Sequence, residues 1–159
     1  MVDNSERSIA LVVEYDPWIR LLLRDLLTDE GYAVLEASNG SAALRLAQRQ
    51  APALVLLDLV LPEQSGLELL TELKSTRATV HVPVIAVSAR TDLLACAAEL
   101  ADAVVAKPFD IDELLAKLGA ARRRSCAGAN VPKFIAPART CQHAGTRGGL
   151  QQRTICAPP

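Results

Sequence analysis

Short aliphatic runs alternate along the chain with longer segments in which apolar residues recur every three or four positions. Most of these runs have no polar interruption, which is typical of strands buried on both faces of a parallel sheet. The three-to-four spacing between the runs predicts helices. The expected strands are 9–13, 32–38, 54–59, 83–88 and 103–106. The expected helices start at Pro17, Ala42, Leu67, Leu93 and Asp110 or Ile111, and the last is expected to end near Ala121.

This regular alternation of strand and helix predicts an α/β fold. Five strands with right-handed crossovers suit a flavodoxin-like parallel sheet in the order 2-1-3-4-5, with helices on both faces. Residues 1–8 then form an N-terminal extension and residues 9–121 the folded domain. Residues 122–159 have no periodicity and are interrupted by glycine and proline, so we expect a disordered tail and no fused output domain.

Charge is divided unevenly between these parts. All 18 acidic residues lie at or before Glu113, whereas residues 119–159 hold seven basic residues and no acidic one. The run Arg122–Arg124 could contact nucleic acid, but no DNA-binding module follows it, and arginine at a helix end also complements the helix dipole. We therefore expect no nucleic-acid partner, and the basic tail could instead fold back onto the acidic domain.

Cellular location is predicted from what the sequence lacks. No apolar stretch approaches the ~18 residues that a membrane span needs. The first residues contain acids and no apolar segment of the kind found in signal peptides. These observations predict a cytoplasmic protein without membrane contact.

Polar side chains follow the predicted strands at the points where each strand ends. Glu14 and Asp16 follow the first, Asp58 the third, Ser88 the fourth and Lys107 the fifth. Carboxyl ends of parallel strands share one edge of the sheet, where α/β proteins bind ligands. An aspartate can accept a phosphoryl group as an acyl phosphate, and carboxylates bind Mg²⁺. A lysine and a hydroxyl can bind phosphate oxygens. This set indicates phosphoryl chemistry.

Four motifs, taken in order, resemble the receiver domain of bacterial two-component response regulators. The first strand and its acidic loop are similar over 11–20, and the phosphoacceptor motif over 56–69. Residues 83–89 resemble the strand that carries the switch hydroxyl, and 106–110 the segment with the family's lysine. The resemblance covers about residues 9–121 and agrees with the predicted fold.

The resemblance implies that a histidine kinase or a phosphotransfer protein phosphorylates Asp58. Mg²⁺ would be held by Glu14, Asp58 and the backbone carbonyl of Val60, with Ser88 as the switch hydroxyl. Lys107 would form the ion pair with the phosphoryl group and precede a cis peptide bond to Pro108. The signal would pass by contact to an unknown downstream protein. The domain would not be an enzyme, beyond slow loss of its own phosphate.

Three positions depart from the family pattern. Tyr15 replaces the second acid of the first loop, and a phenol with a pKa near 10 is a poor Mg²⁺ ligand at neutral pH. Asp16 is a candidate replacement ligand, although neighbouring side chains of an extended segment point in opposite directions. Weakened Mg²⁺ binding is therefore expected. Val104 replaces an aromatic residue that follows the switch hydroxyl, and the fourth helix is expected to be short.

Three alternatives to a phosphoacceptor make different demands on the sequence. A degenerate pseudo-receiver would bind its partner without being phosphorylated, and Tyr15 leaves this possibility open. A phosphatase of the haloacid dehalogenase type also uses an aspartate at a strand end, but it needs a second acid two residues later, where this chain has Val60. No glycine-rich phosphate loop follows the first strand, which argues against a nucleotide-binding enzyme.

Overall fold

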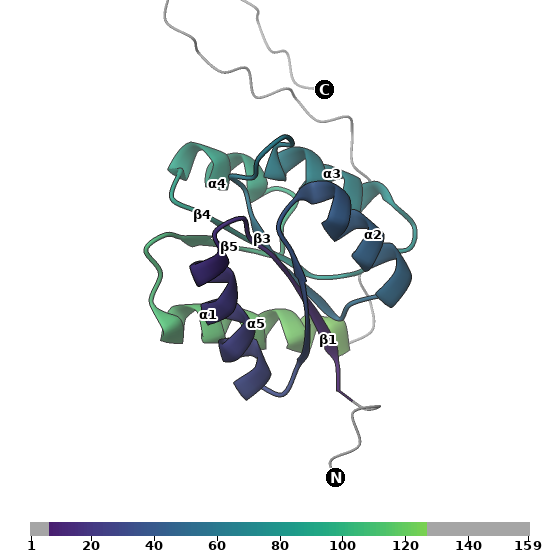
Figure 1. The fold of residues 1–159 in the computed structure, drawn as a ribbon, viewed down its shortest axis with the longest axis vertical. Coiled ribbons are helices and arrows are strands. Elements are labelled where there is room, and N and C mark those ends of the chain that lie inside the picture. Colours follow the sequence, from purple (N-terminus) through teal and green to yellow (C-terminus); the bar gives the residue numbers. More distant parts are fainter. Residues whose placement is uncertain (1–6, 127–159) are drawn as a thin grey trace, which may run out of the picture.

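Five parallel strands form one sheet in the order β2-β1-β3-β4-β5 (Figure 1). The computed structural model describes residues 7–126, with side chains up to Arg123. The strands are β1 (Ile9–Val13), β2 (Ala33–Ala37), β3 (Leu54–Asp58), β4 (Val84–Ser88) and β5 (Ala103–Ala106). The predicted fold class and strand order are thus confirmed, and β2 lies at one edge of the sheet, with β5 at the other.

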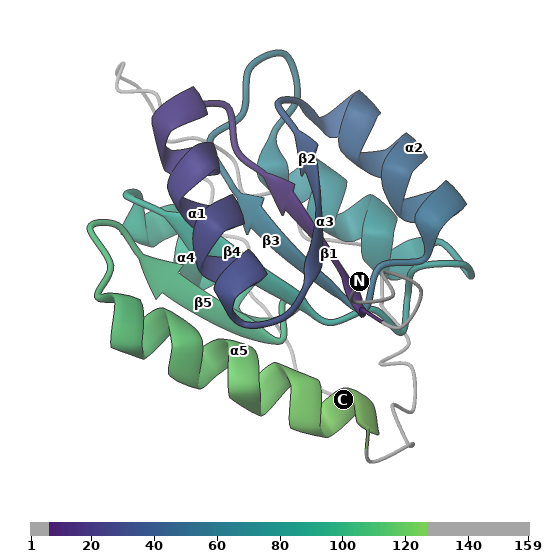
Figure 2. The same ribbon diagram turned by 60° about the horizontal axis from the view of Figure 1, so that its bottom comes forward.

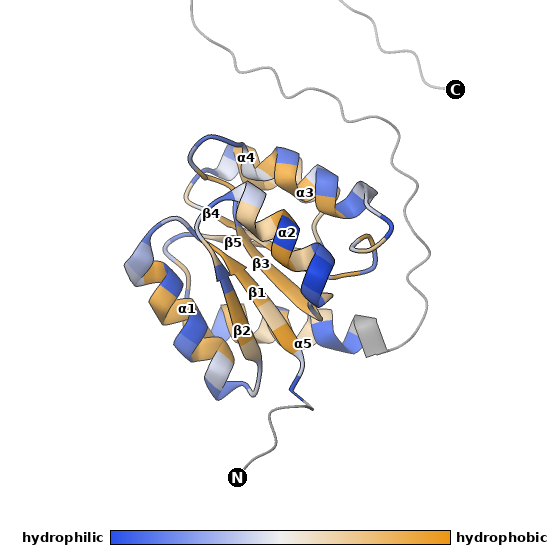
Figure 3. Ribbon diagram, turned by 45° about the vertical axis from the view of Figure 1, so that its right-hand side comes forward, coloured by the Kyte–Doolittle hydropathy of each residue, from blue (hydrophilic) through white to orange (hydrophobic). Residues whose placement is uncertain are grey.

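Helices cover both faces of the sheet. They are α1 (Pro17–Asp29), α2 (Gly40–Gln50), α3 (Gly66–Ser75), α4 (Thr91–Ala97) and α5 (Ile111–Cys126). Helices α1 and α5 lie together on one face (Figure 2), and the other three cover the opposite face. Each face has its own core, and the strands between them are the most hydrophobic part of the chain (Figure 3). Burial on both faces explains why the strand sequences are continuously apolar.

The first three helices begin at polar side chains that bind free backbone N–H groups. Asp16 Oδ1 accepts hydrogen bonds from the amides of Trp18 at 2.8 Å and Ile19 at 3.1 Å. Asn39 caps α2, and Ser65, whose place before the apolar helix expected from Leu67 is typical of a cap, caps α3. Such caps satisfy donors that have no partner within the helix. They also fix where each helix leaves the carboxyl edge of the sheet.

Several helix boundaries differ from those expected. Helix α2 starts two residues before Ala42 and α3 one residue before Leu67. Helix α4 starts at Thr91 instead of Leu93 and ends at Ala97, so it is seven residues long, in agreement with a short fourth helix. Helix α5 continues past the expected end at Ala121 to Cys126, because no proline or glycine interrupts the chain between Gly119 and Gly128. The predicted disorder of the tail concerns mainly residues 127–159, which lie outside the described residues.

A buried ion pair joins α3 to the amino end of β4. Lys74 Nζ lies 2.7 Å from Asp102 Oδ2 and donates a second hydrogen bond, 2.8 Å long, to the carbonyl of Val82. The same oxygen of Asp102 accepts from the amide of Val84 at 2.9 Å. The charges are thus paired and hydrogen-bonded, as buried charges require. This ion pair stabilises the end of the sheet where the strands begin, whereas the predicted functional residues lie where the strands end.

Candidate functional site

Strand register brings Glu14 and Asp58 to the same level of the sheet. Val13 is the partner of Leu57 in the pairing of β1 with β3. Glu14 is the residue after Val13, and Asp58 is the residue after Leu57. Both side chains are buried, with relative exposures of 2% for Glu14 and 7% for Asp58. Two acids therefore lie next to each other under the carboxyl edge of the sheet, as the sequence predicted.

Lys107 bridges these two carboxylates. Its Nζ atom lies 2.6 Å from Glu14 Oε2 and 2.8 Å from Asp58 Oδ2. The other oxygen of each acid accepts a backbone hydrogen bond. Glu14 Oε1 accepts from the amide of Asp16 at 3.0 Å, and Asp58 Oδ1 from the amide of Val60 at 2.8 Å. The three side chains form a single charged cluster, in which one ammonium group faces two carboxylates.

Burial and charge shift two pKa values in this cluster. Burial raises the pKa of Glu14 above its usual value, and the negative charge of Asp58 adds to this, against the hydrogen bond from Lys107. Burial alone would lower the pKa of Lys107. The hydrogen bonds from its ammonium group to Asp58 and Glu14 outweigh burial and raise this pKa instead. Lys107 is thus held in its charged form at neutral pH.

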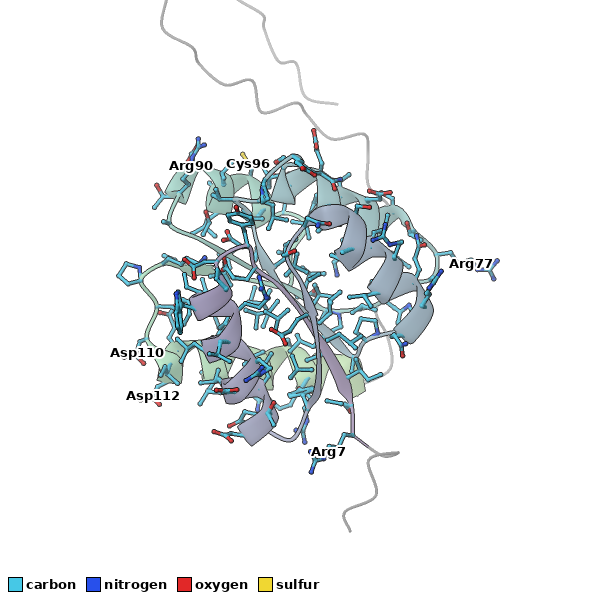
Figure 4. All side chains as sticks on the ribbon, viewed as in Figure 1. Arg7, Arg77, Arg90, Cys96, Asp110 and Asp112 are labelled. Atoms are coloured by element: carbon cyan, nitrogen blue, oxygen red, sulfur yellow. The ribbon has the colours of Figure 1, made fainter. Side chains whose placement is uncertain are left out.

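Ser88 lies at the end of β4 and is fully buried. Its Oγ atom accepts a hydrogen bond from the amide of Arg90 at 3.1 Å, and its carbonyl accepts one from the amide of Lys107 at 2.8 Å. The side chain of Arg90 points away from the domain (Figure 4) and pairs with Asp92. The predicted hydroxyl therefore lies beside the lysine segment, whereas Arg90 does not join the acidic cluster.

The loop after β1 brings one carboxylate, that of Glu14, to Asp58, so the site differs from one built from three acids. The cap on α1 occupies Oδ1 of Asp16, and Tyr15 is 60% exposed. Among residues 7–126, no three acidic, histidine or cysteine side chains are grouped closely enough to hold a metal ion. The structure thus brings Glu14, Asp58 and Lys107 together and directs Asp16 towards the helix.

The last strand and the residues after it agree with the predicted lysine segment. The Lys107–Pro108 peptide bond is cis, as expected from the resemblance. Val104 is half-buried in β5, and its carbonyl accepts a hydrogen bond from Lys117 Nζ at 2.6 Å. Sequence reasoning missed Lys117 and Arg20, because contacts with backbone carbonyls leave no pattern in the sequence.

Comparison with known proteins identifies the class that this fold and site define. The model of the response regulator receiver domain family matches residues 10–119, and the chain belongs to this family. Receiver domains are signalling modules rather than conventional enzymes, and they partner with histidine kinases or phosphotransfer proteins. They generally bind Mg²⁺ at the phosphorylation site. Within the described residues, no helix is both long and apolar enough to cross a membrane.

Two curated relatives illustrate the similarity. The transcriptional regulatory protein KdpE of Mycobacterium tuberculosis is 44% identical over 131 residues, which cover 80% of this chain and 57% of KdpE. Sporulation initiation phosphotransferase F of Bacillus subtilis is 35% identical over 105 residues, which cover 65% of this chain and 85% of that protein. The chain thus spans little more than half of KdpE. The expectation that it has no nucleic-acid partner stays a prediction.

Solved structures show the same fold. The CheY-like receiver domain protein of Methanospirillum hungatei superimposes with a TM-score of 0.72 and 25% identity, covering 78% of this chain and all of that one. A response regulator structure from Chloroflexus aurantiacus gives a TM-score of 0.71 at 24% identity, covering 75% of this chain and all of that one. The sheet and its helices are therefore those of a receiver domain.

Proposed function

We propose that Asp58 accepts a phosphoryl group from a histidine kinase or a phosphotransfer protein, and that the domain passes the signal on by contact with another protein. The observation that carries this proposal is the bridge from Lys107 to Asp58 and Glu14. It places a permanent positive charge beside the strand-end carboxylate that would be phosphorylated. The functional unit is the predicted domain of residues 9–121 together with the remainder of α5.

The transfer itself is a substitution at phosphorus. A carboxylate oxygen of Asp58 attacks, the bond from phosphorus to the donor's histidine nitrogen breaks, and the leaving imidazole takes up a proton. Lys107 then pairs with the phosphoryl oxygens, since phosphoryl transfer depends chiefly on positioning and charge neutralisation. The hydroxyl of Ser88 would donate a hydrogen bond to a phosphoryl oxygen, and the resulting movement of Oγ would act on the amide of Arg90, which donates to it at the start of α4. Subsequent hydrolysis of the acyl phosphate is slow and resets the domain.

The residues present fit Mg²⁺, with one acid fewer than a site built from two loop acids and Asp58 would supply. Two protein carboxylates suffice for this ion when waters and phosphate complete its shell. Glu14, Asp58 and the backbone carbonyl of Val60 would hold it, and it would neutralise the phosphoryl oxygens. The predicted ligand Asp16 acts in this proposal as the cap of α1, because that cap already occupies its Oδ1 atom. With Tyr15 contributing no carboxylate, binding is weakened.

Intact mass after incubation with acetyl phosphate and Mg²⁺ tests the acceptor. The wild type is expected to gain one phosphoryl group, and Asp58→Asn is expected to gain none. Asp16→Asn is the matched control, because asparagine caps helices as well as aspartate does, so labelling should persist. An adduct that remains in Asp58→Asn would place the acceptor elsewhere. A wild type that stays unlabelled at every Mg²⁺ concentration would support the pseudo-receiver, the second candidate, which Tyr15 favours.

Exposed apolar residues lie at the same edge of the sheet as the acidic cluster and support a protein as the phosphoryl donor. The large hydrophobic side chains that are exposed in the described part of the chain are Tyr15, Trp18, Leu22, Val60 and Ile111. Each lies in a loop or in the first two turns of a helix that leaves the carboxyl edge of the sheet. Exposed apolar patches of this kind mark protein contact sites.

Replacing Trp18 with alanine separates protein contact from chemistry. The indole is 77% exposed, so its removal should change stability little, and labelling by acetyl phosphate should continue at the wild-type rate. Transfer from a phosphorylated histidine phosphotransfer protein should slow by about tenfold, because interface aromatic residues often carry much of the binding energy. Equal slowing with both donors would show that Trp18 acts on the site and not on docking.

A further inference from the structure

Arg20 contacts the backbone of the acidic loop between β1 and α1. Its Nη1 atom donates hydrogen bonds to the carbonyl of Glu14 at 2.7 Å and to the carbonyl of Tyr15 at 3.2 Å. Its Nε atom lies 3.5 Å from the carboxylate of Glu36 on β2, and only 21% of its side chain is exposed. One guanidinium group therefore joins α1, the loop after β1 and the edge strand.

Other contacts hold the two ends of this loop: the amide of Glu14 donates to the carbonyl of Ala37 at 3.1 Å, and Asp16 caps α1. The carboxylate of Glu14 is held by Lys107 and by the amide of Asp16, a residue of the same loop. Tyr15 is exposed and offers no carboxylate that could tie the loop to a cation. The direction of the Glu14 side chain thus depends on the peptide groups on either side of Tyr15, and Arg20 holds both of their carbonyls.

We propose that Arg20 is a positioning residue that keeps the carboxylate of Glu14 against Lys107 and at the Mg²⁺ position. Arginine suits this role because its planar group is always charged and presents several donors at once. Hydrogen bonds from a charged donor are also stronger than those between neutral groups. The expected effect of Arg20 on phosphorylation rests on the proposed function, whereas the hydrogen bonds of Arg20 do not depend on that function.

Arg24 offers a matched control on the same helix. It lies one turn after Arg20, and its Nη1 atom is 3.9 Å from the same carboxylate of Glu36. Its hydrogen bonds go to the neighbouring Asp25. Replacing Arg24 with methionine therefore removes an arginine that faces Glu36 and leaves the hydrogen bonds from Arg20 to the loop intact, whereas Arg20→Met removes those hydrogen bonds as well.

The amide signal of Asp16 in a proton–nitrogen correlation spectrum reports the position of Glu14 directly. This N–H donates to Glu14 Oε1, so it should shift in Glu14→Gln. We expect a shift of the same direction in Arg20→Met, a smaller one in Arg20→Lys, and none in Arg24→Met. The measurement needs no phosphoryl donor and no metal. An unchanged Asp16 signal in a folded Arg20→Met protein would overturn the proposal.

The Mg²⁺ dependence of labelling by acetyl phosphate gives the functional readout. The Mg²⁺ concentration for half-maximal rate should rise about tenfold in Arg20→Met, the factor expected for one lost charge-assisted hydrogen bond. Arg20→Lys should recover part of this loss, and Arg24→Met should match the wild type. A merely structural role would lower thermal stability in both methionine variants without moving this midpoint. If the wild type takes no phosphoryl group, the proposed function fails, and the Asp16 signal still decides the role of Arg20.

Discussion

Replacing Tyr15 with aspartate is expected to strengthen Mg²⁺ binding by one to two orders of magnitude, about the size of effect that supporting residues have on metal sites. The substitution adds a carboxylate to the loop that carries Glu14, one of the two acids that Lys107 bridges, and it removes a side chain that is a poor Mg²⁺ ligand. Titration of Mg²⁺ against the fluorescence of Trp18, three residues further along, measures the change. Tyr15→Phe removes the hydroxyl and adds no charge, so its affinity should equal that of the wild type.

The same substitution should alter stability in a metal-dependent way. Without Mg²⁺, a further negative charge near Glu14 and Asp58 is expected to lower the free energy of unfolding, because like charges repel each other. With Mg²⁺, tighter binding stabilises the folded state in proportion to the logarithm of the ion concentration over Kd. Thermal melts with and without the ion should therefore diverge more in Tyr15→Asp than in the wild type. Identical Mg²⁺ affinities of both proteins would contradict the proposal that Tyr15 weakens Mg²⁺ binding.

Substitution of Gly66 by alanine is expected to lower the free energy of unfolding by about 3 kcal/mol, near the upper end of typical overpacking costs. A Cβ atom at this position would lie 2.4 Å from Leu59 Cα and 2.6 Å from the carbonyl oxygen of Asp58. Both are backbone atoms, so relief requires the chain after β3 to move. Urea unfolding measures the loss, and slower labelling by acetyl phosphate should accompany it, since Asp58 moves with its backbone.

Alanine substitutions at two other glycines provide a comparison for this change in the free energy of unfolding. At Gly119, within α5, the nearest atom to an added Cβ is the end of the Arg123 side chain at 3.5 Å, and alanine should stabilise the helix by about 0.5–1 kcal/mol. At Gly40 the contact is the side chain of Gln64, which can swing away, so the cost should be intermediate. If Gly66→Ala is as stable as Gly119→Ala, the backbone after β3 can move away from the added Cβ atom at little cost in free energy, and the prediction is wrong.

The sheet and the centre of the site could be predicted from the sequence because both depend on local patterns. Continuous apolar runs identify strands buried on both faces, and a parallel sheet sends every strand end to the same edge. The closeness of Glu14, Asp58 and Lys107 followed from that geometry. Ser65 as a cap followed from its place before an apolar helix. No long-range information was needed for these predictions.

The remaining features depend on contacts that the sequence pattern does not encode. Asp16 was predicted as a candidate metal ligand, but the first turn of α1 offers it two free amides, and a helix cap satisfies them locally. Lys74 and Asp102 are 28 positions apart and form an ion pair only once α3 has packed against the segment that precedes β5. Arg20 binds backbone carbonyls, and because every residue type has one, the sequence does not show which carbonyls it binds. Such contacts become visible only in three dimensions.

The buried pair of Lys74 and Asp102 has a consequence for how a signal could travel through the domain. It fastens the amino end of β4 to α3, whereas the carboxyl end of the same strand carries Ser88 and leads into the short helix α4. Because the ion pair holds the amino end of β4, a displacement that starts at Ser88 is expected to be larger at the carboxyl end of the strand than at Val84. Displacement caused by phosphorylation of Asp58 should therefore grow along β4 towards α4, and hydrogen exchange should change there while the amide of Val84 stays protected.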